Sequence, residues 1–393
     1  MTFEDVRSLT EQYVEGTYAR FPLAIESGHG ATCVDFDGKR YIDFGSGIGV
    51  NALGFADADW AAAVSSQAAR VAHTSNLYYS LPGALVARDL CEKSGMKKVF
   101  FCNSGAEANE GAIKAARKWG EMHKGRDCCE IITLCNSFHG RTVATLAATG
   151  QDVMHTHFFP FPEGFCYVEP GDIANLSDKI TGKTCAVMIE LIQGEGGVVP
   201  LTTDFVQGVA ALCQERDILL IVDEVQTGIG RTGWLYCYQS FGLSPDIVSS
   251  AKGLASGLPF GAVLFGARTA GTLTPGEHAT TFGMNLVAAA GAMVVLSRLD
   301  NAFLNTVKEK GRYISDALSR CENVASVTGM GLMIGVLPKR GDARDIVSKC
   351  MDKGLIVLTA KNKVRLLPPL VISDAEINNG LAILTEVLQE VAQ

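Results

Sequence analysis

Short, continuous apolar runs alternate with helical patterns through the middle of this 393-residue chain. The runs are KKVFFC (97–102), EIITLC (130–135), CAVMIE (185–190), ILLIVDE (218–224), DIVSSA (246–251) and FGAVLFG (260–266). Between them, stretches such as AEANEGAIKAARKWGEM and FVQGVAALCQER carry apolar residues at helical spacing. Uniformly apolar strands separated by helices are typical of a mostly parallel sheet that is covered on both faces. The sequence therefore predicts an α/β fold.

The two ends of the chain differ from this middle. Residues 20–50 contain VDFDGKRYIDFG, in which an Asp-Gly turn between alternating runs indicates a β-hairpin. From residue 291 onward, helical patterns alternate with VASVTGMGLMIGVL and GLIVLTAKNKVRLLPPL, and a final amphipathic helix follows. We therefore expect a large domain over residues 51–290. A smaller α+β domain would combine residues 291–393 with an N-terminal segment, residues 1–50.

Composition narrows the possible functions. The formal net charge of −8 argues against nucleic acid as the main partner, because phosphate binding favours a basic face. The N-terminus lacks the apolar core of a secretory signal, and the longest mostly apolar run, 286–296, is too short to span a bilayer. None of the twelve cysteines forms a CxxC pair, and several lie in apolar runs, which favours buried thiols over disulfides or metal ligands. We expect a cytoplasmic protein without a metal or membrane partner.

Polar residues follow several of the predicted strands. Ligands of open parallel sheets bind beyond the carboxyl ends of the strands, so these residues are candidates for a site. Ser104, Gly105 and Ala106 follow VFFC and open a helix, where free backbone N–H groups favour an anion such as phosphate. Ser104 and Glu107 equally fit a helix-capping box, which needs no ligand.

Two further strand ends carry candidate side chains. Phe138 and Arg141 follow EIITLC, where an aromatic ring can stack on a flat ligand and a guanidinium can hold a carboxylate, although both also suit an ordinary loop. His139 is a possible base, but the sequence shows no partner for it. Glu190 and Glu195 follow CAVMI, and Glu195 between glycines also fits a simple turn.

Asp223 and Lys252 are harder to explain without a ligand. Asp223 ends a buried strand, where an ionised carboxylate needs a cationic or protonated partner. Lys252 is the only charged residue from Ile247 to Ala267. Burial lowers the pKa of a lysine and favours the neutral amine, the form that makes Schiff bases with carbonyls. The small neighbours of Lys252 leave room for a bulky adduct.

These candidates together describe one ligand, with a phosphate, a flat ring, a group that needs a carboxylate, and a carbonyl. Pyridoxal 5′-phosphate has all of these features. Asp223 would hold the pyridine nitrogen protonated, Phe138 would stack on the ring, and Lys252 would bind the aldehyde. The G-x-G-x-x-G match at Gly228–Gly233 does not predict a dinucleotide site, because Trp234 follows it instead of a helix and no acid lies about twenty residues on.

The motifs FFCNSGAEANEGAIKAAR, SFHGRT, IQGEGGV, DEVQTGIGRTG, SAKGLASGLPFGA, TTFGMN and RLLPPL occur in this order along nearly the whole chain. The sequence resembles the class-III aminotransferases, which are fold-type-I pyridoxal-phosphate enzymes. The chain length, SGIGVNALG and SNLYYS are most similar to the branch that acts on N-acetylornithine. The resemblance implies a large domain with a mostly parallel sheet between helices, beside a smaller α+β domain.

The resemblance also implies roles for individual residues. The cofactor would be bound by Ser104, Gly105, Ala106, Phe138, Asp223, Val225, Gln226, Lys252 and Thr281. Val225 would lie against the second face of the ring, Gln226 would contact its hydroxyl, and Lys252 would also shuttle the substrate proton. Thr281 would reach the phosphate of the neighbouring subunit, which implies a homodimer with shared active sites. The family usually has Gly, Gly and Pro where this chain has Ala279, Met284 and Leu286.

Three further residues match the substrate-binding residues of the family. Arg141 and Arg365 would bind the substrate carboxylates, and Glu195 would pair with Arg365. We expect transfer of the δ-amino group of N-acetylornithine to 2-oxoglutarate, as in arginine biosynthesis. Glu195 would neutralise Arg365 for that donor and swing away for glutamate or 2-oxoglutarate. Succinylornithine, ornithine and 4-aminobutyrate are alternative donors, and a racemase, an aminomutase or a non-catalytic homologue are alternative functions.

Overall fold

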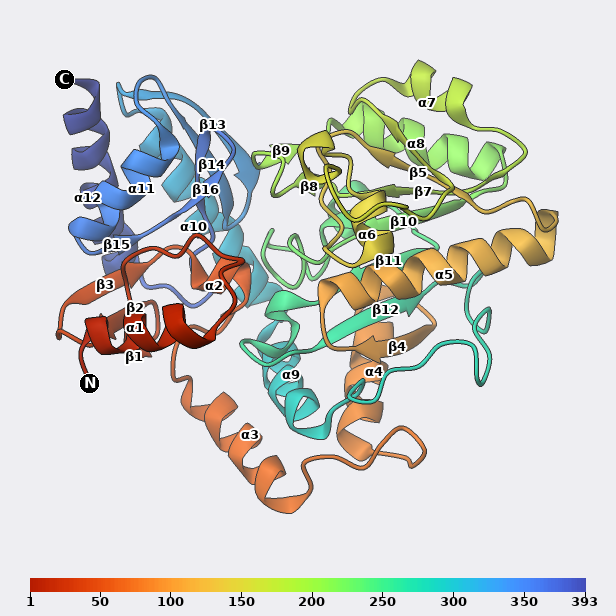
Figure 1. Cartoon of the computed structure of the whole chain (residues 1–393), viewed down its shortest axis with the longest axis horizontal. Helices are drawn as coiled ribbons and strands as arrows, with labels where there is room; N and C mark the ends of the chain where they lie inside the picture. The colour runs from red at the N-terminus through yellow and green to blue at the C-terminus, as the bar shows by residue number, and fades with distance from the viewer.

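A seven-stranded sheet forms the centre of the larger part of the molecule (Figure 1). The computed structural model describes residues 1–393. Across the sheet the strands are β4 (Lys98–Cys102), β12 (Gly261–Phe265), β11 (Ile247–Ser250), β10 (Leu219–Asp223), β7 (Thr184–Ile189), β5 (Glu130–Leu134) and β6 (Phe165–Val168). Only β12 runs antiparallel to its neighbours, β11 and β4. The predicted mostly parallel sheet is confirmed, and β6 is a strand that the sequence did not predict.

Helices cover both faces of this sheet because its strands are apolar on both sides. Every residue of β7, β10, β11 and β12 is buried. In β10, Leu219 and Ile221 pack into one core together with α5 (Gly105–Lys124), whereas Leu220 and Val222 belong to the larger core that includes α8 (Thr203–Glu215). Alternate side chains of a strand point to opposite faces, so a uniformly apolar strand requires a layer on each side.

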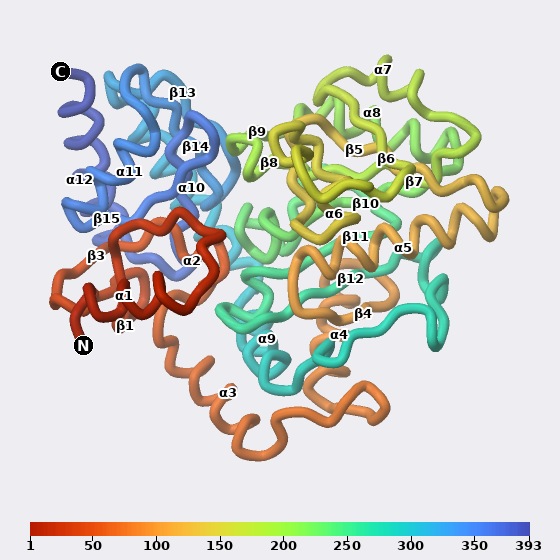
Figure 2. Tube along the Cα trace, viewed as in Figure 1, coloured from red at the N-terminus to blue at the C-terminus, as the bar shows by residue number.

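The second part of the molecule combines the two ends of the chain. One sheet contains β1 (Ile25–His29), β2 (Thr32–Asp35), β3 (Arg40–Asp43) and β15 (Leu355–Ile356), and another contains β13 (Val324–Met330), β14 (Met333–Pro338), β17 (Lys363–Leu366) and β16 (Leu358–Ala360). The predicted hairpin is β2–β3. Because β3 pairs with β15, the N-terminal segment lies beside the C-terminal one, as the Cα trace also shows (Figure 2). The pairing joins the two ends of the chain, and the division at residue 290, which falls within the helix Leu286–Arg298, stays a prediction.

Helices complete both parts. The second part includes α1 (Phe3–Tyr13), α10 (Asn301–Ser319), α11 (Ala343–Asp352) and α12 (Asp374–Ala392). The apolar run near residue 290 is the helix α9 (Leu286–Arg298), which packs against α3 (Ala58–Arg70) and α4 (Leu81–Ser94). No single helix is long and apolar enough to cross a membrane, although α9 and α10, bent by 79° at their junction, meet criteria of length and composition as a pair.

Candidate active site

A cavity of about 270 Å³ lies beyond the carboxyl ends of the central strands. It is lined by Gly105, Ala106, Asn109, Phe138, His139, Gly140, Arg141, Glu190, Asp223, Val225, Gln226 and Lys252. These residues come from the start of α5 and from the ends of β5, β7, β10 and β11, four strands that are adjacent in the sheet. The sheet thus brings together side chains that are up to about 150 residues apart in the sequence, as expected for ligand sites of this fold class.

Asp223 ends β10 and is held by three hydrogen bonds. Its Oδ2 atom accepts from Nδ2 of Asn109 at 2.7 Å and from Nδ1 of His139 at 2.8 Å, and its Oδ1 atom accepts from the backbone N–H of Val225 at 3.0 Å. Asp223 is only 4% exposed. Donors that favour the ionised form offset the cost of burying a carboxylate. The orientation of the Asp223 carboxylate in the wall of the cavity is therefore fixed by these bonds.

The sequence did not identify the two side chains that hold Asp223. Asn109 was not singled out at all, although it lies four residues after Gly105 on α5 and therefore on the same face of the helix. His139 had no partner visible in the sequence, because the partner lies 84 positions away. The helical spacing from Gly105 was the one sequence signal that pointed to Asn109.

Lys252 begins the short helix that follows β11. Its backbone has φ of +47°, a left-handed conformation that non-glycine residues adopt rarely and often at functional sites. Burial lowers the pKa of Lys252 below its ordinary value, opposed in part by the charge of Glu195. Its ammonium makes no salt bridge with any carboxylate. Lys252 therefore presents a larger fraction of neutral, nucleophilic amine to the cavity than a surface lysine would.

Glu190 holds two loops that border the cavity. Its carboxylate accepts hydrogen bonds from the backbone N–H of Phe138 at 2.8 Å and of Gly194 at 3.2 Å. Burial raises the pKa of Glu190 to about 7. Phe138 lines the cavity, and the guanidinium of the exposed Arg141 lies 5.7 Å from its ring centroid. Glu190 thus positions Phe138, a role that the sequence did not predict.

Arg365 and Glu195 form an ion pair beside the cavity. Nη1 of Arg365 lies 2.5 Å from Oε1 of Glu195 and also donates to Oε1 of Gln226 at 3.1 Å. Arg365 is 3% exposed, and its Nε atom has no hydrogen-bond partner. Burial alone would raise the pKa of Glu195, but the charge of Arg365 holds it below its ordinary value. The two side chains are thus paired in the structure, their roles toward a substrate stay predictions, and Gln226 connects the pair to the cavity.

The start of α5 faces the same cavity. Gly105 approaches Val225 so closely that a Cβ on Gly105 would lie 2.5 Å from Cγ1 of Val225. The first N–H groups of a helix have no intrahelical acceptor, and here they open into the space lined by Gly105 and Ala106. Ser104 is exposed and is not among the lining residues. Its hydroxyl accepts from the N–H of Glu107 at 3.2 Å, which matches the capping alternative.

Thr281 lies on the surface, outside the cavity of its own chain. Asn76 donates from Nδ2 to the backbone oxygens of Thr280 at 3.3 Å and of Gly283 at 2.9 Å, which ties this loop to the segment before α4. Met284 stands where the family usually has glycine, and it retains a positive φ of +60°. The departure from the family is therefore accommodated without loss of the glycine-like backbone.

The cavity matches pyridoxal phosphate in its chemistry. It combines a helix start suited to phosphate, a buried aspartate suited to a protonated ring nitrogen, and a lysine of lowered pKa suited to an aldehyde. Because residue 105 is glycine, the helix start stays open, whereas a side chain at this position would crowd against Val225. A mostly parallel sheet with this set of residues is the arrangement of a pyridoxal-phosphate-dependent enzyme.

Comparisons with known proteins agree, and the chain belongs to the class-III aminotransferase family, whose model matches residues 13–388. The acetylornithine aminotransferase of Haemophilus ducreyi is 50% identical over 99% of this chain and 100% of the relative. The acetylornithine aminotransferase of Caldanaerobacter subterraneus is 43% identical over 97% of this chain and 98% of the relative. The family and the cofactor predicted from the sequence are thereby confirmed.

Solved structures of this family have the same fold. The ornithine aminotransferase from Toxoplasma gondii ME49 matches with a TM-score of 0.95 at 31% identity, covering 100% of this chain and 96% of that one. The N-acetylornithine aminotransferase from Stenotrophomonas maltophilia K279a matches with a TM-score of 0.84 at 36% identity, covering 98% of each chain. The predicted fold class is confirmed, and the roles of single residues remain predictions.

Proposed function

We propose that this chain transfers the δ-amino group of N-acetylornithine to 2-oxoglutarate, giving N-acetylglutamate 5-semialdehyde and glutamate, as a step of arginine biosynthesis. The relative from Haemophilus ducreyi supports this substrate by its name and its 50% identity. The observation that carries the proposal is the ion pair between Arg365 and Glu195 at 2.5 Å beside the cavity. An enzyme that uses both of these substrates in one site needs a cation that binds the carboxylate of one substrate. The same cation must be neutralised when the other substrate presents no carboxylate at that position.

The cofactor would be held by residues that surround the cavity. The N–H groups at Gly105 and Ala106, with the neighbouring Ser104, would bind the phosphate. Phe138 and Val225 would contact the two faces of the ring, and Gln226 would contact its hydroxyl. When bound, the cofactor supplies the carbonyl that receives the amino group and a ring that accepts electron density.

Asp223 and Lys252 would carry the chemistry. Asp223 would keep the ring nitrogen protonated, because its carboxylate is already oriented by hydrogen bonds from Asn109 and His139. Lys252 would take the proton from the substrate carbon that bears the donor amine. It would then deliver this proton to the aldehyde carbon of the cofactor. Its lowered pKa increases the fraction of neutral amine that can act as this base.

Glu195 would select between the two substrates. With N-acetylornithine bound, Glu195 would stay on Arg365, and Arg141 at the exposed rim would bind the distant α-carboxylate. With 2-oxoglutarate or glutamate bound, Glu195 would turn away, Arg365 would bind the α-carboxylate, and Arg141 the γ-carboxylate. The free Nε of Arg365 leaves a further donor for that carboxylate.

A second candidate donor is unacylated ornithine. The specific observation in its favour is the structural match to the Toxoplasma gondii ornithine aminotransferase, which has the higher TM-score of the two structures above, 0.95. The higher sequence identity to acetylornithine aminotransferases favours the acylated donor.

The active enzyme would be a cytoplasmic homodimer. Large apolar side chains are exposed on the segment before α4, at the first residue of α4 and on the Thr281 loop, namely Leu77 at 88%, Tyr78 at 69%, Leu81 at 71% and Phe282 at 60%. An exposed apolar patch of this kind marks an interaction surface. A second copy covering it would bring its own Thr281 toward the phosphate end of the first cavity.

A panel of amino donors tests the function. Initial rates with 2-oxoglutarate would be measured for N-acetylornithine, N-succinylornithine, ornithine and 4-aminobutyrate. We expect the highest kcat/KM with N-acetylornithine. A higher kcat/KM with ornithine would overturn the substrate assignment, and absence of transfer from every donor would overturn the proposed function.

A further inference from the structure

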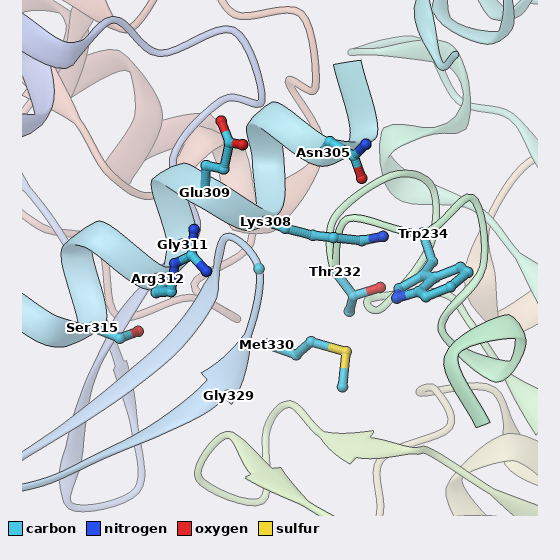
Figure 3. Close-up of a pocket in the computed structure, with 11 residues that line it drawn as sticks. Thr232, Trp234, Asn305, Lys308, Glu309, Gly311, Arg312, Ser315, Gly329 and Met330 are labelled. Atoms are coloured by element: carbon cyan, nitrogen blue, oxygen red, sulfur yellow. The ribbon is translucent and has the colours of Figure 1, made fainter. Parts of the chain in front are cut away.

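A second and larger cavity, of about 590 Å³, lies where the two parts of the molecule meet. Three segments form it: the loop of Thr232 and Trp234, one face of α10, and the end of β13 with the turn that follows it (Figure 3). None of its lining residues belongs to the candidate active site. The roles that the family motifs imply all concern the active site, so they assign no function to this second cavity.

Glycines bring the three segments together. A Cβ on Gly311 of α10 would lie 2.1 Å from the backbone oxygen of Gly331, and a Cβ on Gly331 would lie 2.5 Å from the backbone carbon of Thr232. Because these backbones are in contact, the cavity beside them has fixed walls on three sides. Such a concave site at a domain junction is a common position for a small-molecule ligand.

Two cations on the cavity wall have no acidic partner. Lys308 and Arg312 are four residues apart on α10 and therefore lie on the same face of the helix. Neither forms a salt bridge or a hydrogen bond to a protein group. Glu309 also lines the cavity, but its carboxylate points away from Lys308 and Trp234 (Figure 3). The wall thus carries an excess of positive charge that a bound anion can neutralise.

Trp234 adds a flat apolar surface to these cations. Nζ of Lys308 lies 3.9 Å from the centroid of the Trp234 ring, and the thioether of Met330 lies nearby (Figure 3). Trp234 is 38% exposed, which is unusual for the largest aromatic side chain. A ligand that is both planar and anionic satisfies both groups, because its ring replaces the ammonium on the indole while its charge binds Lys308 and Arg312.

We infer that this cavity is a second binding site, for a small organic anion with a planar body. Lys308 and Arg312 bind the anionic group, which is a phosphate or a carboxylate, and Trp234 stacks on the planar body. Asn305 and Ser315 at the rim supply further hydrogen-bonding groups. The inference is independent of the amino donor that the active site uses.

Binding would be measured on the cofactor-loaded enzyme by calorimetry and by tryptophan fluorescence. Glutarate would be present to fill the active-site arginines. Two probes combine a planar ring with an anionic group: adenosine monophosphate carries a phosphate, and benzoate carries a carboxylate. Two control probes separate these features: inorganic phosphate is the anion without the ring, and adenosine is the ring without the anion. Arg312→Met removes a cavity cation, and Arg320→Met removes an exposed cation at the end of the same helix as the matched control.

We expect saturable binding of adenosine monophosphate or benzoate that weakens about tenfold in Arg312→Met and in Lys308→Met, as expected for loss of one charge-assisted hydrogen bond. Arg320→Met should bind like the unaltered enzyme, and Trp234→Leu should weaken the planar probes alone. All variants should keep their transaminase rates. No saturable binding at about 10 mM probe, equal binding by inorganic phosphate, or an equal effect of Arg320→Met would overturn the inference.

Discussion

Nδ1 of His139 lies 2.8 Å from Oδ2 of Asp223, and both side chains are buried beside the candidate active site. Asn109 donates to the same oxygen at 2.7 Å. Asp223 is therefore oriented by Asn109, which the sequence did not identify, and by His139, which the sequence indicated only as a possible base. The negative charge that the cofactor ring would meet has its position fixed before any ligand binds, which lowers the cost of ordering it.

Replacing His139 should weaken the cofactor site without unfolding the protein. In His139→Ala, Asp223 loses one of its two side-chain donors, so we expect a loss of about ten- to a hundredfold in cofactor affinity and in kcat, since such a bond contributes about 1.5–3 kcal/mol. Cofactor absorbance during a titration measures the cofactor affinity, and steady-state rates give kcat. His157→Asn, at an exposed histidine, is the control and should change neither. Unchanged affinity and rate in His139→Ala would contradict the positioning role.

A side chain at position 105 should block the phosphate end of the site. Gly105→Ala places a Cβ at 2.5 Å from Val225, so Val225 must shift or the helix start must move. We expect cofactor affinity to fall by at least about tenfold. The double variant Gly105→Ala/Val225→Ala removes the clash and should regain part of the loss. If Gly105→Ala alone binds the cofactor normally, the close approach does not shape the site.

Stability should fall between about pH 5 and pH 7 because of Glu224. Burial raises the pKa of this fully buried carboxyl to about 7 from an ordinary value of 4.5. Between these values the folded state keeps the proton that the unfolded chain releases, so stability is lost as pH rises through the folded pKa. The loss from Glu224 should be about 1–3 kcal/mol and should disappear in Glu224→Gln, whereas the similar contribution of the buried Glu190 should remain.

Melting temperatures at several pH values test this expectation. The difference between the Tm at pH 5 and at pH 8 should be smaller in Glu224→Gln than in the unaltered protein. Glu322→Gln, at an exposed position, is the control and should keep the original difference. A Glu224→Gln variant with the full original difference would show that Glu224 stays ionised in the folded protein.

A charge on the exposed apolar patch should prevent dimer formation. Tyr79 is fully exposed in the single chain and lies next to Tyr78. Tyr79→Glu would bury a carboxylate at the proposed interface, so we expect dimer affinity to fall by at least about thirtyfold. Sedimentation measures the mass, and the transaminase rate should fall with the dimer fraction. Met122→Glu, on the exposed side of α5, should remain dimeric. An unaltered dimer in Tyr79→Glu would place the interface elsewhere.

Much of the fold could be predicted because its strands are uniformly apolar and its helices are periodic. The strand ends then pointed to Asp223 and Lys252, since a lone charge next to buried strands is costly without a function. Asn109 and the role of His139 were missed because their contacts with Asp223 join distant segments, which no local pattern encodes. Ser104 shows the converse problem, since one sequence pattern fits both a phosphate site and a helix cap, and the structure has the bond to Glu107.

The most direct test of the account concerns Lys252 as the group that moves the substrate proton. Single-turnover amino transfer from N-acetylornithine would be followed in the unaltered enzyme, in Lys252→Ala and in the exposed control Lys339→Arg. The account predicts that Lys252→Ala loses at least about a thousandfold in rate, within the range of general acid–base catalysis, and that added methylamine restores part of it. The control should react normally. A Lys252→Ala enzyme that transfers the amino group at the original rate would contradict the central claim.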